Sequence, residues 1–75
     1  MSDVKMKSVY SDSVDRIGHD PKTEELHVKW SGNDKTSIYS GVSTDLAHSV
    51  MNAWSVGKAV HAEIKKAGFD HRYAE

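Results

Sequence analysis

The stretch Ser55-Val56-Gly57-Lys58 places a hydroxyl, a glycine and a lysine at the expected start of a helix. Backbone N–H groups at a helix N-terminus lack intrahelical partners, and the helix dipole makes that end positive. Together with the ammonium of Lys58, these groups could hold a phosphate or a carboxylate. The stretch is not a Walker A loop, because it lacks the earlier glycine and the Ser or Thr after the lysine. The simpler interpretation, which we favour, is a capped helix start in which Gly57 lets two helices pack closely.

Aromatic side chains could form a stacking surface for a base or an adenine ring. Each tryptophan falls in the apolar phase of its element, which predicts a core position. Tyr39 follows Ile38 on an expected strand, so the two side chains point to opposite faces. We therefore expect Tyr39 to be an exposed ring on the outer face of the sheet, beside His27, Lys29 and Lys35. The aromatic residues considered are Tyr10, Trp30, Tyr39, Trp54 and Tyr73.

The C-terminal segment is mildly basic, with Lys65, Lys66, His71 and Arg72. Such a segment is usually a solvated helix end. If the tail folds back, it could join Lys58 in a patch that binds an anion or RNA. The candidate ligand-binding residues are Ser55, Gly57, Lys58, Tyr39, His27 and Arg72.

We expect no metal, no cofactor and no catalysis. The five histidines show no HxxxH or HxH spacing, whereas a metal site needs three or four converging ligands. No serine lies in a G-x-S-x-G setting. The pair Glu24-Glu25 spans a turn and a strand start, so one carboxylate faces solvent. No set of residues therefore supplies a nucleophile, a base and an oxyanion site together.

Two helices account for the apolar pattern of residues 42–67. Apolar residues step by four along one series (Val42, Leu46, Val50, Trp54) and along a second series (Val56, Val60, Ile64). Ser43 is a favourable N-cap for the first helix, which should end near residues 53–54. Ser55 can cap the second, which should run to about Ala67, with Gly68 as its C′ residue.

The residues before the helices predict three strands. Residues 25–30 alternate apolar and polar side chains, as a half-buried strand does. Strands are also expected at 8–20, with a bend at 11–13, and at 35–39. Turns at 20–24 and 31–34 separate them. We therefore predict an α+β fold with a three-stranded antiparallel sheet covered on one face by two C-terminal helices. Residues 1–7 are expected to be a flexible leader and residues 8–75 a single domain.

The composition and charge of the chain limit the classes of location and partner that we expect for it. The chain has 75 residues, 37% hydrophobic and 28% charged, which suits one globular domain. With no cysteines, no signal peptide and no apolar run of about 20 residues, a cytoplasmic protein without membrane partners is expected. The net charge of −1 ranks nucleic acid below other partners. A domain this small buries only about 60–65% of its unfolded surface, so we expect a homo-oligomer.

The order of these elements and several short motifs resemble the KTSC domain. The matching residues are Ser11, Val14, Ile17 to Asp20, Leu26 to Trp30, Gly32, Tyr39 to Val42, Ser55 to Lys58, and Ile64. That family takes its name from an occurrence at the C-terminus of some lysyl-tRNA synthetases, and it also occurs as a stand-alone protein in bacteria and phages. The resemblance implies three strands followed by two helices, and a bacterial or phage setting, but no particular reaction.

The sequence therefore predicts a small non-catalytic binding module that captures an anionic, nucleotide-like ligand. Lys58, the backbone of Ser55 and Gly57, and Tyr39 would supply the contacts. In a phage, such a protein could sequester a signalling nucleotide of host immunity in the host cytoplasm. One alternative is an adaptor or inhibitor that binds a host protein. Another is an accessory domain that binds RNA or tRNA, which the synthetase association suggests.

Overall fold

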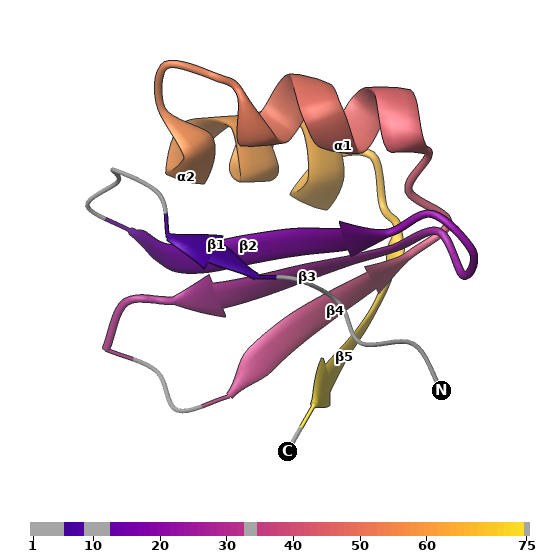
Figure 1. The fold of residues 1–75 in the computed structure, drawn as a ribbon, viewed down its shortest axis with the longest axis horizontal. Helices are drawn as coiled ribbons and strands as arrows, with labels where there is room; N and C mark the ends of the chain where they lie inside the picture. The colour runs from indigo at the N-terminus through magenta and orange to yellow at the C-terminus, as the bar shows by residue number, and fades with distance from the viewer. Residues whose placement is uncertain (1–5, 9–12, 33–34, 75) are drawn as a thin grey trace.

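The computed structural model describes residues 6–8, 13–32 and 35–74, which form one antiparallel sheet and a layer of helices (Figure 1). The sheet has the order β1-β2-β3-β4-β5, so each strand lies beside its neighbours in sequence. The helices cover one face of the sheet, and the α+β class is confirmed. The elements are β1 (Lys7–Ser8), β2 (Val14–Asp20), β3 (Glu25–Trp30), β4 (Thr36–Ser40), α1 (Thr44–Met51), α2 (Val56–Ala59), the π-helical η1 (Val60–Lys65) and β5 (Asp70–Ala74).

The three predicted strands correspond to β2, β3 and β4. The bounds of β3 are those that the apolar–polar alternation predicts, and β4 is shifted from the predicted 35–39 by one residue. β2 begins at Val14, with a register shift against β3 between Val14 and Arg16. Most of the predicted bend at 11–13 and the turn positions 33–34 lie outside the described residues. The same is true of residues 1–5 of the predicted leader.

Two strands were not predicted. β1 pairs with β2, with Lys7 opposite Ile17, and β5 pairs with β4 along its whole length. The prediction of three strands is therefore wrong in number. Both added strands lie at the edges of the sheet; β1 has only two residues, and β5 consists of exposed or partly exposed residues. Pairing with an existing strand satisfies their backbone groups, which a local sequence pattern does not reveal.

The first helix begins as predicted and ends early. The Ser43 hydroxyl oxygen accepts a hydrogen bond from the backbone N–H of Leu46 at 3.2 Å. After Met51, the side chain and backbone of Asn52 both donate to the carbonyl of His48, at 2.9 and 3.0 Å. The helical step of four therefore stops before Trp54. The prediction that Trp54 is in the core is wrong, since its relative exposure is 101%.

The second helix changes type along its length. Ser55 is its N-cap residue but makes no side-chain capping hydrogen bond. The short α2 continues as η1, and the backbone N–H of Lys66 bonds the carbonyl of His61, five residues earlier, at 3.2 Å. The helix ends at Lys65 rather than at Ala67, and Gly68 follows with a positive φ of 78°. The glycine lets the chain turn back toward the sheet.

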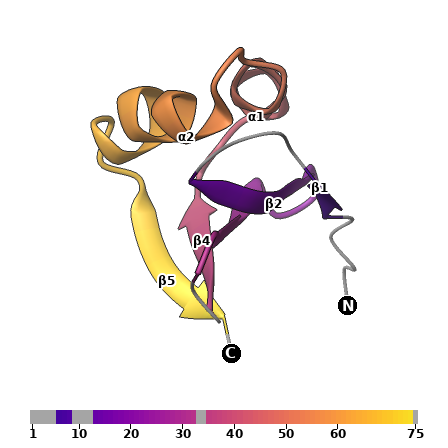
Figure 2. The same ribbon diagram turned by 90° about the vertical axis from the view of Figure 1, so that its left-hand side faces the viewer.

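The core lies between the sheet and the helices. The residues of both apolar series, except Leu46 and Trp54, are buried in one cluster with side chains of β2, β3 and β4. Each such side chain contributes about 1.5–3 kcal/mol on leaving water. The buried hydrophobic cluster comprises Val14, Ile17, Leu26, Val28, Tyr39, Val42, Ala47, Val50, Val56, Val60 and Ile64. Seen from the end of the sheet, β5 extends down and away from the helical layer (Figure 2).

Candidate functional site

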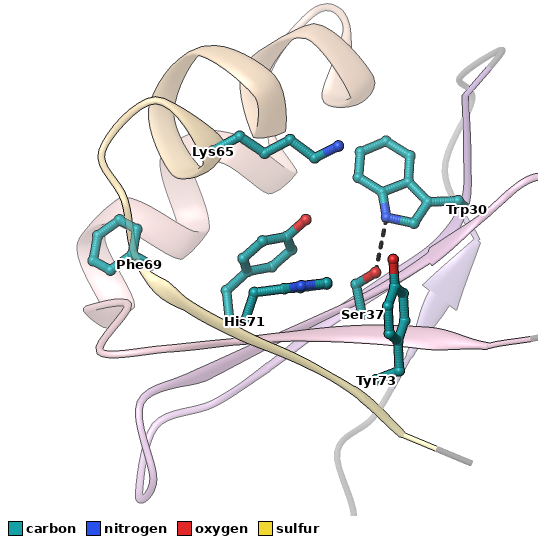
Figure 3. A pocket seen from close by; sticks show the side chains of 7 residues that line it. Trp30, Ser37, Lys65, Phe69, His71 and Tyr73 are labelled. Carbon is teal, nitrogen blue, oxygen red and sulfur yellow. Dashed lines mark hydrogen bonds between the residues drawn. The ribbon is translucent and has the colours of Figure 1, made fainter.

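A pocket of about 450 Å³ opens between the β4–β5 side of the sheet and the end of η1. Its walls come from β3, β4, β5, the last residue of η1 and the link between η1 and β5 (Figure 3). Small-molecule sites in proteins usually measure about 300–1,000 Å³. The lining residues are Trp30, Ser37, Tyr39, Lys65, Phe69, His71 and Tyr73.

Strand register determines which side chains enter the pocket. Ser37 pairs with Tyr73 and Tyr39 pairs with His71 across β4 and β5. Paired residues point to the same face, and alternate residues along a strand share a face. Four lining residues therefore project from two adjacent strands toward the same side as the helices.

Trp30 links the sheet to the helical layer. Its indole N–H donates to the Ser37 hydroxyl oxygen at 3.1 Å. The Lys65 ammonium lies 4.8 Å from the centroid of its ring, within the range of a cation–π interaction. The ring of His61, one turn before Lys65, lies 5.5 Å away. The π-helical turn thus presents two side chains to one indole.

Three rings form the wall on the β4–β5 side. Tyr39 and His71 have centroids 4.9 Å apart, and His71 contacts Tyr73 edge-on at 4.7 Å. Tyr39 is only 3% exposed, whereas Tyr73 is 55% exposed. Lys35 carries a second cation toward this wall, with its ammonium 5.9 Å from the Tyr73 centroid. His71 and Tyr73 are therefore the exposed rings of this wall.

The electrostatics of the pocket favour an anion. Lys65 is the permanent cation among the described residues that line it, and that set of seven contains no carboxylate. Burial raises the pKa of Tyr39 above its ordinary value of 10.0, against smaller opposing effects of hydrogen bonding from Ser37 and Trp30. The phenol therefore keeps its proton at neutral pH and adds no negative charge.

Tyr39 does not lie where the sequence analysis expected it. The prediction of an exposed ring beside His27 is wrong, because Tyr39 pairs with Leu26 and shares its inward face, whereas Ile38 pairs with His27 on the outer face. The assumption that the neighbour of Ile38 would be exposed failed because Ile38 is itself buried, 4% exposed, on the outer face. A strand with buried residues on both faces gives no clear alternation.

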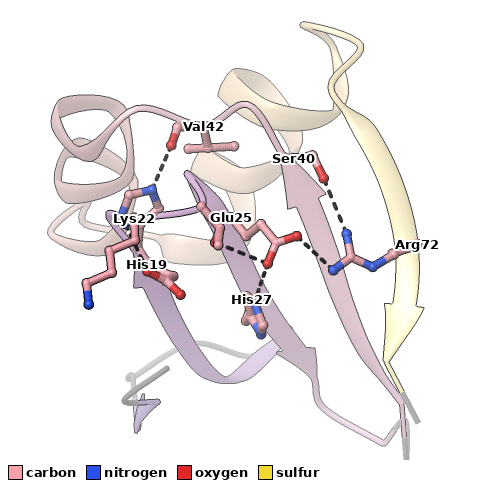
Figure 4. Close-up of polar contacts among 9 residues, drawn as sticks. His19, Lys22, Glu25, His27, Ser40, Val42 and Arg72 are labelled. Atoms are coloured by element: carbon pink, nitrogen blue, oxygen red, sulfur yellow. Dashed lines mark hydrogen bonds and ion pairs between the residues drawn. The ribbon is translucent and has the colours of Figure 1, made fainter. Parts of the chain in front are cut away.

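His27 and Arg72 come together on the outer face, away from the pocket. The Arg72 guanidinium donates to the Glu25 carboxylate at 2.7 Å, and the His27 ring lies 3.6 Å from the same carboxylate (Figure 4). Arg72 also donates to the Ser40 hydroxyl at 3.4 Å. The Arg72 hydrogen bond lowers the pKa of Glu25 below its ordinary value of 4.5, against a smaller effect of burial. These residues connect β5 to β3 across β4.

The corner at Ser55, Gly57 and Lys58 is separate from both clusters. Gly57 is buried, Lys58 is exposed, and none of the three residues lines the pocket. Of the six predicted site residues, the structure therefore places one, Tyr39, in the pocket.

Sequence reasoning missed Lys65, Phe69, His71 and Tyr73 as one site. The alternation in residues 69–73 of aromatic or histidine side chains with Asp70 and Arg72 was the available signal. Its spacing of two predicts that these rings share one face of a strand. The position of Lys65 depends on the π-helical turn, for which the sequence has no recognised marker.

Among the residues that the structure describes, the acidic side chains and the histidines are not gathered into a metal site, and the helices are short. Within residues 6–8, 13–32 and 35–74, no three His, Asp or Glu side chains are grouped as a metal ion would require. In the same described part of the chain, no helix is long and apolar enough to cross a membrane.

Comparison with known proteins identifies the family. The model of the KTSC domain matches residues 10–69. The chain belongs to the KTSC domain family. A KTSC domain protein from Yersinia pestis, known from its crystal structure, is 26% identical, with a TM-score of 0.88, and the alignment covers 97% of this chain and 100% of that one. No curated protein matches the sequence. The KTSC match includes five of the pocket residues and ends before His71 and Tyr73.

Proposed function

We propose that this KTSC domain is a binding module that captures a small, anionic, nucleotide-like ligand in the pocket between β3, β4, β5 and η1. The observation that carries the proposal is the combination of ring faces with the Lys65 ammonium at one cavity. Stacking of a base on an aromatic side chain contributes about 1–3 kcal/mol. A lysine supplies a point charge for a phosphate or a carboxylate.

Binding accounts for the polar groups better than catalysis does. Ser37 is 1% exposed and its oxygen already accepts the Trp30 indole N–H, so it is poorly placed to act as a nucleophile. The proposal keeps the ligand class that the sequence suggests and moves the site from Ser55–Lys58 to the pocket. Capture without conversion would let the protein sequester its ligand.

The first experiment compares Lys65→Met with Lys66→Met. Both residues are exposed lysines at the end of η1, but only Lys65 lines the pocket. Thermal shift with mono-, di- and cyclic nucleotides should detect a ligand of the wild-type chain, because a concentration 100-fold above Kd adds about 2.7 kcal/mol to stability. For a domain of this size, each kcal/mol raises Tm by roughly 4–8 °C.

The Lys65 variant should bind such a nucleotide at least about fivefold more weakly, and the Lys66 variant should bind it as the wild type does. The corresponding nucleoside, which lacks the phosphate, should bind both variants equally. Absence of any shift at millimolar nucleotide, or equal loss in the two variants, would refute the proposal.

A further inference from the structure

The strand β5 is paired with a neighbour on one side only. Asp70–Ala74 pairs with β4, and no other strand of the described residues lies on its far side. At the opposite edge of the sheet, β1 has two residues. The outward N–H and C=O groups of an edge strand can pair with a strand of another chain. β5 is therefore the longer of the two edges that the sheet offers to a partner.

The segment from Phe69 to Tyr73 is complementary to itself when it is read in the opposite direction. It has a ring at each end, an acid and a base inside the rings, and His71 at its centre. If the segment pairs antiparallel with a copy of itself about His71, Asp70 lies opposite Arg72 of the copy. In the same register, Phe69 lies opposite Tyr73 of the copy, and symmetry makes each pair occur twice. Opposite charges and aromatic pairs across two strands stabilise their pairing, whereas like charges directly opposite destabilise it.

The charged groups of β5 are placed so that both can take part in such pairing. Asp70 and Arg72 lie opposite Ser40 and Ile38 of β4, on the outer face of the sheet, and both are exposed. The Arg72 guanidinium already donates to Glu25 and Ser40, yet its side chain remains 55% exposed. A guanidinium has five N–H donors, so a second carboxylate can also bind to it.

We propose that β5 pairs with β5 of a second copy of this chain, antiparallel and centred on His71, so that the two sheets become one. Opposite residues of paired strands point to the same face, so the two helical layers lie on the same side of the joined sheet. The wall formed by His71 and Tyr73 then meets the same wall of the second copy. The two pockets become one groove with rings from both copies, and Tyr73, which is 55% exposed in the single chain, is covered.

Sedimentation velocity of the wild-type chain, from about 10 µM to about 1 mM, measures this association. No ligand is added, so the result does not depend on the proposed function. A contact between two short strands is small, which predicts a reversible equilibrium between monomer and dimer. The mass should rise toward twice that of one chain as concentration increases. A monomer at every concentration overturns the proposal.

Two charge variants test whether the edge of β5 is the contact. Asp70→Lys places like charges opposite each other in both pairs with Arg72, and it should weaken dimerisation at least about fivefold. Glu63→Lys changes an exposed carboxylate on η1, gives the same net charge, and should dimerise as the wild type does. Circular dichroism checks that both variants fold. Equal dimerisation of the two folded variants overturns the contact at β5.

Single cysteines test the register, because the chain has none of its own. In His71→Cys the two thiols lie on directly opposite residues, whose Cα atoms in an antiparallel pair are about 4.5–5.5 Å apart, within the range of a disulfide. Mild oxidation should therefore produce a covalent dimer. Tyr73→Cys should cross-link much less, because the same residue of the copy lies four positions along the paired strand. Equal cross-linking of the two variants, or stronger cross-linking of Tyr73→Cys, overturns the pairing centred on His71.

Discussion

Trp30 is the residue on which the pocket depends most. Its indole N–H donates to the Ser37 hydroxyl on β4, and the Lys65 ammonium of η1 lies over its ring. One side chain therefore contacts both the sheet wall and the cation of the pocket. Trp54 has the same side chain with neither contact, at full exposure. The two tryptophans therefore provide an internal comparison of the same amino acid in two environments.

We expect the two tryptophans to differ sharply in their effect on stability. Trp30→Phe removes the indole N–H and leaves the buried Ser37 oxygen without it, which should cost about 1–3 kcal/mol. Trp54→Phe should change the free energy of unfolding by no more than about 0.5 kcal/mol. Urea denaturation followed by far-UV circular dichroism measures both, and equal costs would contradict the assigned roles.

At the residue scale, burial could be predicted from the sequence wherever apolar residues recur at a regular spacing. Val56, Val60 and Ile64 are buried as their spacing requires. Trp54 is exposed despite its spacing because the helix ends at Asn52, before Trp54. Tyr39 is buried, against the prediction, because β4 buries side chains on both of its faces. These exceptions depend on where a helix is capped and on what covers each face of the sheet. A local sequence pattern contains neither kind of information.

At the element scale, β5 is the strand that completes the site. It presents His71 and Tyr73 to the pocket, while Arg72 between them reaches Glu25 on the outer face. The ion pair spans β4 and thus fastens the edge strand to the middle of the sheet. Without β5 the pocket would lose one wall.

The Glu25–Arg72 pair predicts a pH dependence of stability. The pKa of Glu25 is lower in the folded chain, so on acidification the unfolded chain takes up the proton first. The stabilisation is present above the unfolded pKa of about 4.5 and is lost as pH falls through the lower folded value. For a pair this exposed, it should amount to no more than about 1 kcal/mol.

Denaturation between pH 3 and pH 7 (roughly the window around the carboxylate pKa) measures this effect. Glu25→Gln should flatten the acid side of the stability profile. Glu63→Gln, which alters an exposed carboxylate on η1, should leave the profile as in the wild type. If the two variants show the same profile, the ion pair does not stabilise β5.

Elements whose apolar residues recur with the period of a helix or strand could be predicted from the sequence. Elements that are positioned by pairing with a neighbouring strand could not. β3 and the start of α1 follow from local alternation and a capping serine. β5 consists of exposed or partly exposed residues, and its position comes from hydrogen bonding to β4 and from the turn at Gly68. The pocket was missed for the same reason, because two of its walls are β5 and a π-helical turn.

At the scale of the whole molecule, the pocket arises where the sheet and the helical layer separate. α1 packs on β2, and the helix made of α2 and η1 lies beside α1, toward the β4–β5 side of the sheet (Figure 2). The sheet continues through β4 to β5, and β5 curves away from the helices, which leaves the pocket between β3, β4, β5 and the end of η1 (Figure 2). The resemblance to the Yersinia pestis protein extends over this whole arrangement. Self-association of the domain stays a prediction.

Titration of the ¹⁵N-labelled chain with a nucleoside monophosphate, followed by two-dimensional NMR, tests the central claim most directly. The largest shift changes should occur at the Trp30 indole N–H and at the amides of Lys65, His71 and Tyr73. The amides of Ser55 to Lys58 should stay unchanged. Changes centred on Ser55 to Lys58, or no changes at millimolar ligand, would contradict the assignment of the pocket as the binding site.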